Sequence, residues 1–231
     1  MSDGAENATA DSRARRLTWV TGGILLLLSV VIWFTARGAL AGFAFVKDAV
    51  FAAAAVLFVI GVGRAGSVTD RRPVSTVATL ALAVVPFAQS LWFGLVPASP
   101  GDPNAREDAW VLAAVLYYGS LATLAIIASV GIGRARVLPS PWRWAPLWVV
   151  FWTPLAFVVG ITVSSSVPFD TATSRIAGHL VVDGPAIGTA FLGIVALVLG
   201  IREQRPRIAP VTSTWLSPLA DDPPFLSDSS S

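Results

Sequence analysis

Five polar side chains fall inside or beside stretches of the chain that are otherwise apolar: Lys47, Asp48, Gln89, Arg175 and Asp183. Together they offer an ammonium group, a guanidinium group, an amide and two carboxylates. A few polar groups set in apolar surroundings are typical of a small-molecule site, because they fix the orientation of a ligand. These five residues form the candidate binding site.

Lys47 and Asp48 are neighbours in the sequence, so on a helix they point in different directions and are expected to pair poorly. Lys47 has a long stem that can carry its charge to the membrane surface. Asp48 reaches less far and needs a cation, for which Arg37 and Arg175 are the candidates. If these groups meet, they line an outward-facing polar pocket.

Gln89 follows Pro86, which removes one helical hydrogen bond. Two interpretations stay open for this pair. The helix is either kinked and lines a cavity, or it is held to a neighbour by one side-chain hydrogen bond.

Nucleophilic catalysis has few candidates, because the chain contains no cysteine and a single histidine, His179. Ser120 is expected in the middle of a membrane helix, as in intramembrane serine proteases. Its surroundings read Tyr118-Gly119-Ser120-Leu121, which differs from the Gly-x-Ser-Gly of those enzymes. His179 is expected in an outer loop, where its ring does not reach Ser120. No residue is therefore assigned as catalytic, and we expect a protein that is not an enzyme.

Metal, cofactor and nucleic-acid binding lack a pattern in this sequence. Without cysteine, and with one histidine, only scattered carboxylates remain, and they lack ligand spacing: Asp102, Glu107, Asp108, Asp170 and Asp183. The net charge of +2 gives no general attraction to nucleic acid. We expect no metal, no cofactor and no nucleic-acid partner.

The composition indicates which solvent surrounds these side chains. Of the 231 residues, 55% are hydrophobic and 13% are charged, whereas a soluble domain carries about 25% charged residues. A bilayer core needs about 20 mostly apolar residues per helix. Six stretches qualify: Thr18–Ala36, Gly42–Gly63, Val74–Val96, Ala109–Gly133, Ala145–Val163 and Gly184–Ile201. The predicted fold class is an all-α, polytopic integral membrane protein with about six transmembrane helices.

Basic residues alternate along these predicted spans. Four segments carry three arginines each: Arg13, Arg15 and Arg16; Arg64, Arg71 and Arg72; Arg134, Arg136 and Arg143; Arg202, Arg205 and Arg207. The intervening connections hold only Arg37, Lys47, Arg106 and Arg175. Since cytoplasmic loops hold the excess of Lys and Arg, both termini are predicted to be cytoplasmic, in a multi-pass protein of the cell membrane.

Tryptophan and glycine positions predict how the helices pack. The indoles near span ends suit the membrane interface: Trp19, Trp33, Trp92, Trp110, Trp142 and Trp144. Trp148 and Trp152 lie deeper and are expected between helices. The last span has a stripe of small residues, which predicts a central packing element: Gly184, Gly188, Thr189, Gly193, Ala196 and Gly200.

The chain divides into three parts. Residues 1–16 are predicted to be a disordered cytoplasmic segment, 17–203 the transmembrane domain, and 204–231 a disordered cytoplasmic tail, which is rich in proline and serine. The motif Gly61-Val62-Gly63-Arg64-Ala65 recurs as Gly131-Ile132-Gly133-Arg134-Ala135. This recurrence suggests either an internal duplication or convergence at two cytoplasmic helix ends.

These observations favour a non-catalytic, small accessory or regulatory component of a bacterial cell membrane. Its expected partners are the lipid bilayer and a membrane or cytosolic protein that the tail contacts. The alternative is a small-solute binding or transport protein with the five-residue site as its outward-facing pocket.

Overall fold

In a computed structural model of the chain, the described residues are 3–36, 44–62, 67, 69, 72–96, 103–135, 139–140, 142–167 and 171–202. Within these ranges every regular element is a helix. They follow in the order α1 (Asp3–Thr35), α2 (Ala44–Ile60), α3 (Pro73–Val84), η3 (Val85–Ala88), α4 (Gln89–Gly94), α5 (Pro103–Ala135), η4 (Trp142–Trp144), α6 (Ala145–Ser166) and α7 (Ala172–Arg202). The prediction of an all-α protein is confirmed for this part of the chain.

Four helical stretches are long and apolar enough to cross a membrane: Thr9–Thr35, Glu107–Ala135, Trp142–Ser166 and Ala172–Arg202. The other two predicted spans also contain helices. One is α2, with 17 residues. The other is divided into α3, the 3₁₀ turn η3 and α4, and the division occurs at Pro86, which has no N–H to donate.

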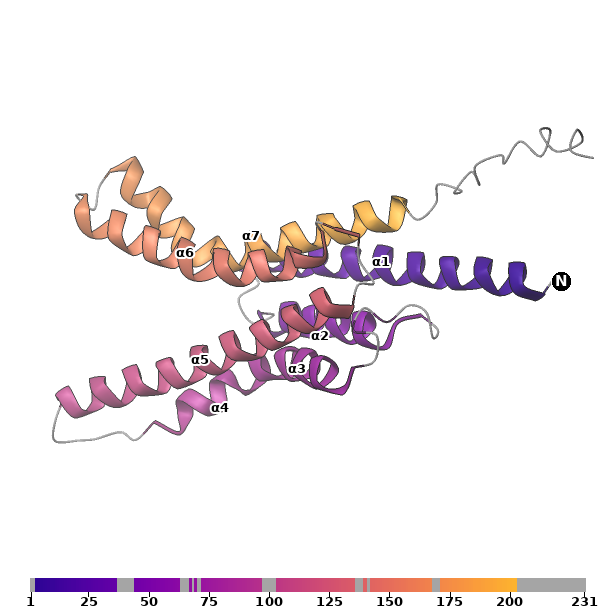
Figure 1. Cartoon of the computed structure of the whole chain (residues 1–231). Coiled ribbons are helices and arrows are strands. Elements are labelled where there is room, and N and C mark those ends of the chain that lie inside the picture. The colour runs from indigo at the N-terminus through magenta and orange to yellow at the C-terminus, as the bar shows by residue number, and fades with distance from the viewer. Residues whose placement is uncertain are drawn as a thin grey trace, which may run out of the picture.

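The helices run alternately in opposite directions, with α3, η3 and α4 as one segment (Figure 1). Packing is closest between α6 and α7, α1 and α7, and α1 and α2. Helix α3 packs against α5 and α2, whereas α5 and α6 touch less. The α4–α5 and α6–α7 pairs diverge at the end of the bundle away from the N-terminus (Figure 1).

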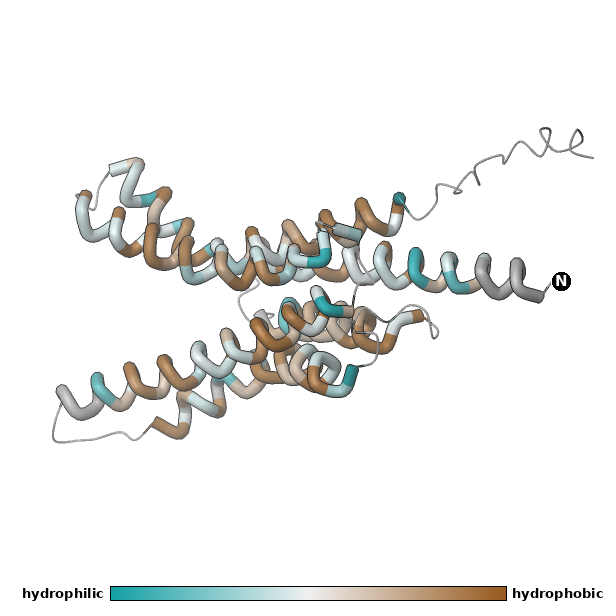
Figure 2. Tube along the Cα trace, in the orientation of Figure 1, coloured by the Kyte–Doolittle hydropathy of each residue, from teal (hydrophilic) through white to brown (hydrophobic). Residues whose placement is uncertain are grey.

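Apolar residues run along the helices, and hydrophilic residues gather toward the helix ends (Figure 2). On α6, for example, Phe151, Phe157 and Val159 are exposed, and their spacing puts them on different sides of the helix. A helix that is apolar all round is a buried helix or a membrane helix. Because these side chains are not covered by the chain itself, they need lipid or another apolar partner.

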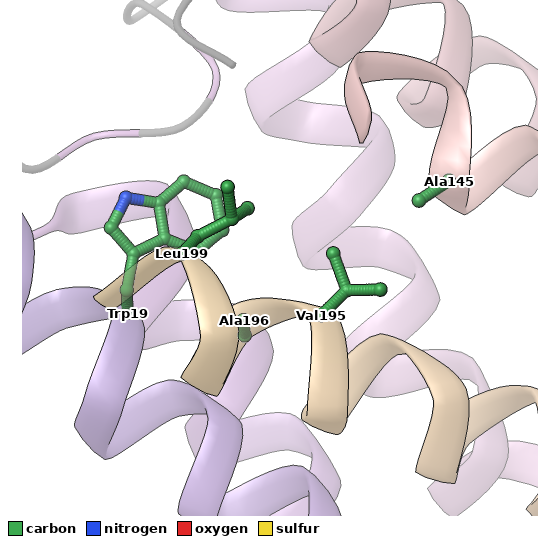
Figure 3. Packing of buried hydrophobic residues seen from close by; sticks show 5 residues of the cluster. All are labelled: Trp19, Ala145, Val195, Ala196 and Leu199. Carbon is green, nitrogen blue, oxygen red and sulfur yellow. The ribbon is translucent and has the colours of Figure 1, made fainter. Parts of the chain in front are cut away.

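A small cluster of buried residues holds one end of the bundle together (Figure 3). Trp19 of α1 and Ala145 at the start of α6 join Val195, Ala196 and Leu199 of α7. The indole of Trp19 also lies 5.5 Å from the ring of Phe58 on α2. Trp19 was expected at the membrane interface, and burial in this cluster corrects that prediction.

Small residues let α1 and α7 approach closely. A Cβ atom added at Gly23 would lie 2.9 Å from the carbonyl oxygen of Gly193, and one added at Gly193 would lie 2.9 Å from Leu27 Cγ. Gly184, Gly188 and Gly200 of α7 are buried as well. The prediction that the last span is a central packing element is therefore confirmed.

Three helices begin well before their predicted spans, among them α5, which begins at Pro103 instead of Ala109. Helix α1 begins at Asp3, so the described residues 3–16 are helical, which corrects the expectation of disorder there. Eight of these fourteen residues are alanine, glutamate or arginine, which are good helix formers, so extending a helix that has already formed in the apolar segment costs little. Helix α7 begins at Ala172 instead of Gly184. The predicted tail, 204–231, lies outside the described residues.

The first glycine of the repeated motif adopts a different conformation in its two copies. Gly61 has φ 69° and follows the last residue of α2, where the left-handed region favours glycine. Gly131 is inside α5, where an added Cβ would lie 2.3 Å from Ser75 Cβ on α3. The first glycine therefore has a different structural role in each motif, whether the motifs arose by duplication or by convergence.

Candidate functional site

Trp33, near the end of α1, contacts groups from two other helices. Its indole N–H donates to Asp183 Oδ1 of α7, with 3.2 Å between the heavy atoms. On α2, Lys47 Nζ lies 5.3 Å from the centre of the same ring. A cation over an indole face is attracted by the ring's quadrupole. Trp33 therefore connects α1 to both α2 and α7.

Lys47 and Asp48 form an ion pair, with Lys47 Nζ 2.5 Å from Asp48 Oδ1. The expectation that these neighbours pair poorly was wrong, because the long side chain of Lys47 brings its ammonium group to the adjacent carboxylate. Each side chain is about 25% exposed. Arg37, one of the two partners proposed for Asp48, lies outside the described residues.

Asp183, which accepts the hydrogen bond from Trp33, is buried, with 7% of its surface exposed. Its Oδ2 atom lies 3.2 Å from His179 Nδ1, one turn earlier on α7. His179 was expected in a loop, but α7 includes it. Its side chain is 74% exposed, so this pair connects a buried carboxylate to the surface.

The five residues Trp33, Lys47, Asp48, His179 and Asp183 are named here the polar network. At about 1.5 Å per helical residue, Trp33 lies roughly 26 Å along α1 from Arg16, and Asp183 roughly 29 Å along α7 from Arg202. A bilayer core is about 30 Å thick. In such a core, the polar network therefore lies toward one boundary, and these two arginines lie toward the other.

The structure brings together three of the five predicted site residues: Lys47, Asp48 and Asp183. Arg175 instead lines a shallow, open hollow with Gly178, His179 and Val182, all from α7. Gln89 is exposed on α4, and η3, which contains Pro86, interrupts the helix just before it. Neither this hollow nor the apolar one described below joins the five predicted residues.

Two members of the polar network, Trp33 and His179, were not among the five predicted site residues. Trp33 was assigned to the membrane interface, and His179 to the surface of a loop. One signal was present: a buried indole N–H requires an acceptor, and few exist among apolar helices. Trp92 and Trp152 satisfy theirs by donating to the carbonyl oxygens of Ala113 and Gly184, respectively. The prediction that Trp152 lies between helices is thereby confirmed.

Ser120 and His179, the two residues considered for catalysis, form hydrogen bonds with different partners. Ser120 donates its hydroxyl to the carbonyl oxygen of Tyr117 within α5, and His179 contacts Asp183 on α7. In the ranges that the structure describes, no group of three or more His, Cys, Asp or Glu residues could hold a metal ion. Both contacts lie within single helices, and neither brings Ser120 together with His179.

A second hollow is apolar and lies between α4 and α5. It is lined by Trp92, Leu95, Val96, Ala109, Leu112, Ala113 and Leu116. The stacked rings of Phe93 and Trp110, 5.2 Å apart, also join the two helices. This surface offers contacts to hydrocarbon and few to a polar solute.

Together, the helical fold and the four long apolar helices define an α-helical protein of the membrane class. Comparison with known proteins finds no family model, no curated protein and no solved structure that matches the chain.

Proposed function

We propose that the protein is a non-catalytic accessory or regulatory component of the cell membrane that works by packing with other membrane or cytosolic proteins. One observation carries this proposal. Three of the polar side chains that were candidates for a solute pocket are engaged by groups of the protein itself: Lys47 pairs with Asp48 on α2, and Trp33 of α1 contacts both Lys47 and Asp183 of α7. Polar contacts between helices in an apolar bundle stabilise and orient those helices.

We further propose six crossings with both termini in the cytoplasm. The alternating helix directions (Figure 1) support this topology, as do the arginines at one end of the bundle. Arg134 and Arg202 lie in the last turns of α5 and α7, and Arg72 precedes α3. A reporter fused after Ser231 should report cytoplasm, and one inserted at Asp102 should report the outside. Both on one side would contradict the topology.

The rival function is binding or transport of a small solute. It is favoured by the hollow at Arg175 and His179, which would present two nitrogen-bearing side chains one turn apart to an anionic solute. Asp183, which contacts His179, would then link the bound solute to the polar network.

A thermal-stability screen separates the two functions. The purified protein is heated with each member of a panel of amino acids, sugar phosphates, nucleosides and polyamines. An accessory component should show no shift in its melting temperature with any of them. A solute that raises the melting temperature of the wild type, but not that of Arg175→Gln, would contradict the accessory role and support the rival. Arg134→Gln, which removes the same charge from the last turn of α5, provides the control variant.

A further inference from the structure

The 3₁₀ turn η4, with the sequence Trp142-Arg143-Trp144, is firmly held at the start of α6. Ala145, the next residue, is buried in the cluster of Figure 3, and Trp142 packs against that cluster. The ring of Trp144 lies so close to α5 that a Cβ added at Gly133 would be 2.6 Å from it. Arg143 therefore lies between two tryptophans that pack against other parts of the bundle.

The Nε atom of Arg143 is buried and, among the residues that the structure describes, has no hydrogen-bond acceptor. The guanidinium carbon lies 5.7 Å from the centre of the Trp144 ring, so the indole supplies a cation–π contact but no acceptor oxygen. Buried polar atoms are nearly always satisfied, by protein, water or a ligand. A guanidinium offers a planar fork of N–H groups, which matches the oxygens of a phosphate.

Apolar residues that continue from η4 along α6 are exposed. Trp148, Phe151 and Leu155 follow at helical spacing, and all three are exposed. Residues three, four or seven positions apart share one face of a helix. A molecule with its phosphate at Arg143 would therefore find an apolar stripe suited to an acyl chain along the same helix.

Other cations stand at the same end of the bundle. Arg72 before α3, Arg134 in α5 and Arg202 in α7 are exposed there. Anionic lipids are attracted to basic residues at a membrane surface. This charge favours a lipid with a net negative headgroup over a zwitterionic one.

We propose that Arg143 binds the phosphate of an anionic phospholipid, with Nε and its neighbouring nitrogens donating to the phosphate oxygens. The indoles of Trp142 and Trp144 flank the headgroup, and an acyl chain lies along Trp148, Phe151 and Leu155. This site is distinct from the polar network and does not depend on the accessory role.

The test is a titration of the full-length protein in neutral detergent with phosphatidylglycerol, in which native mass spectrometry counts the bound lipids. Arg143→Gln should weaken binding of the first lipid about tenfold or more, as expected when charge-assisted hydrogen bonds are lost. Arg202→Gln is the matched control: it removes the same charge at the same end and should change binding by no more than about twofold. Equal losses in both variants would overturn the proposal, because they would show bulk attraction to the basic end.

Two further binding measurements test the proposal without the Arg143→Gln variant. Phosphatidylcholine with the same chains should bind the wild type more weakly, and equal affinity for the two lipids would overturn the proposal even if Arg143→Gln fails to fold. Glycerophosphoglycerol, the headgroup without chains, should compete poorly. Competition at the same concentration as the lipid would overturn the assignment to a lipid and indicate a site for free phosphate compounds.

Discussion

Replacing Trp33 with phenylalanine tests the polar network directly. The change keeps an aromatic ring but removes the N–H that donates to Asp183, which is 7% exposed. A hydrogen bond to a charged group contributes about 1.5–3 kcal/mol. Because Asp183 keeps its contact with His179, the loss should fall near the lower end. The weaker attraction of Lys47 to a phenyl ring adds about 0.5 kcal/mol.

The total, about 2 kcal/mol, converts to a fall in melting temperature of roughly 4–8 °C for a chain of this size. The assay is thermal unfolding in one neutral detergent. Trp110→Phe provides the matched control, because Trp110 is exposed and its stacking on Phe93 survives in a phenyl ring. A surface change of this kind should cost less than about 0.5 kcal/mol.

A double-mutant cycle identifies the partner. Asp183→Asn is measured alone and together with Trp33→Phe. If the indole donates to this carboxylate, the two losses should fail to add by about 1 kcal/mol, within the range found for residues in contact. Additive losses, or an equal fall in Trp110→Phe, would refute the reasoning that the polar network holds α1 against α7.

Four other changes have clear expected results in the same unfolding assay. Gly160→Ala should lower the melting temperature, because the new methyl would lie 2.4 Å from Val181 Cγ2; Gly119→Ala meets nothing within 4 Å and should raise stability by up to about 1 kcal/mol. Asp48→Asn should cost about 1 kcal/mol or less, since its pair with Lys47 is partly exposed, and a loss of several kcal/mol would indicate a second cation. Deleting Pro210–Ser231 should leave the melting temperature nearly unchanged, whereas a fall of many degrees would show that the tail packs on the helices.

Much of the helical arrangement follows from local sequence. Each of the six predicted apolar stretches contains a helix, because a long apolar run has no other way to satisfy its backbone in lipid. At Pro86 a kink was one of two open interpretations, and η3 interrupts the helix there. The helix starts were less predictable: polar residues before Leu17 and before Gly184 continue α1 and α7, and composition alone does not reveal such extensions.

The candidate site was predictable only in part. Lys47, Asp48 and Asp183 were recognised because charged groups are costly among apolar residues. Their partners were not recognised, since Trp33 and Asp183 are separated by 150 positions in the chain. Gln89 resembled them in the sequence but lies on α4, outside the polar network.

The sequence by itself determined the class of protein and the arginine-rich end of the bundle, because hydrophobicity and charge act through solvent and membrane and do not depend on which helices touch. The tertiary structure decided which helices are neighbours and how each is rotated about its axis. That rotation turns the indole of Trp33 toward Asp183 and sets Trp144 against Gly133. Side-chain contacts of this kind depend on packing over the whole bundle, and a single helix does not encode them.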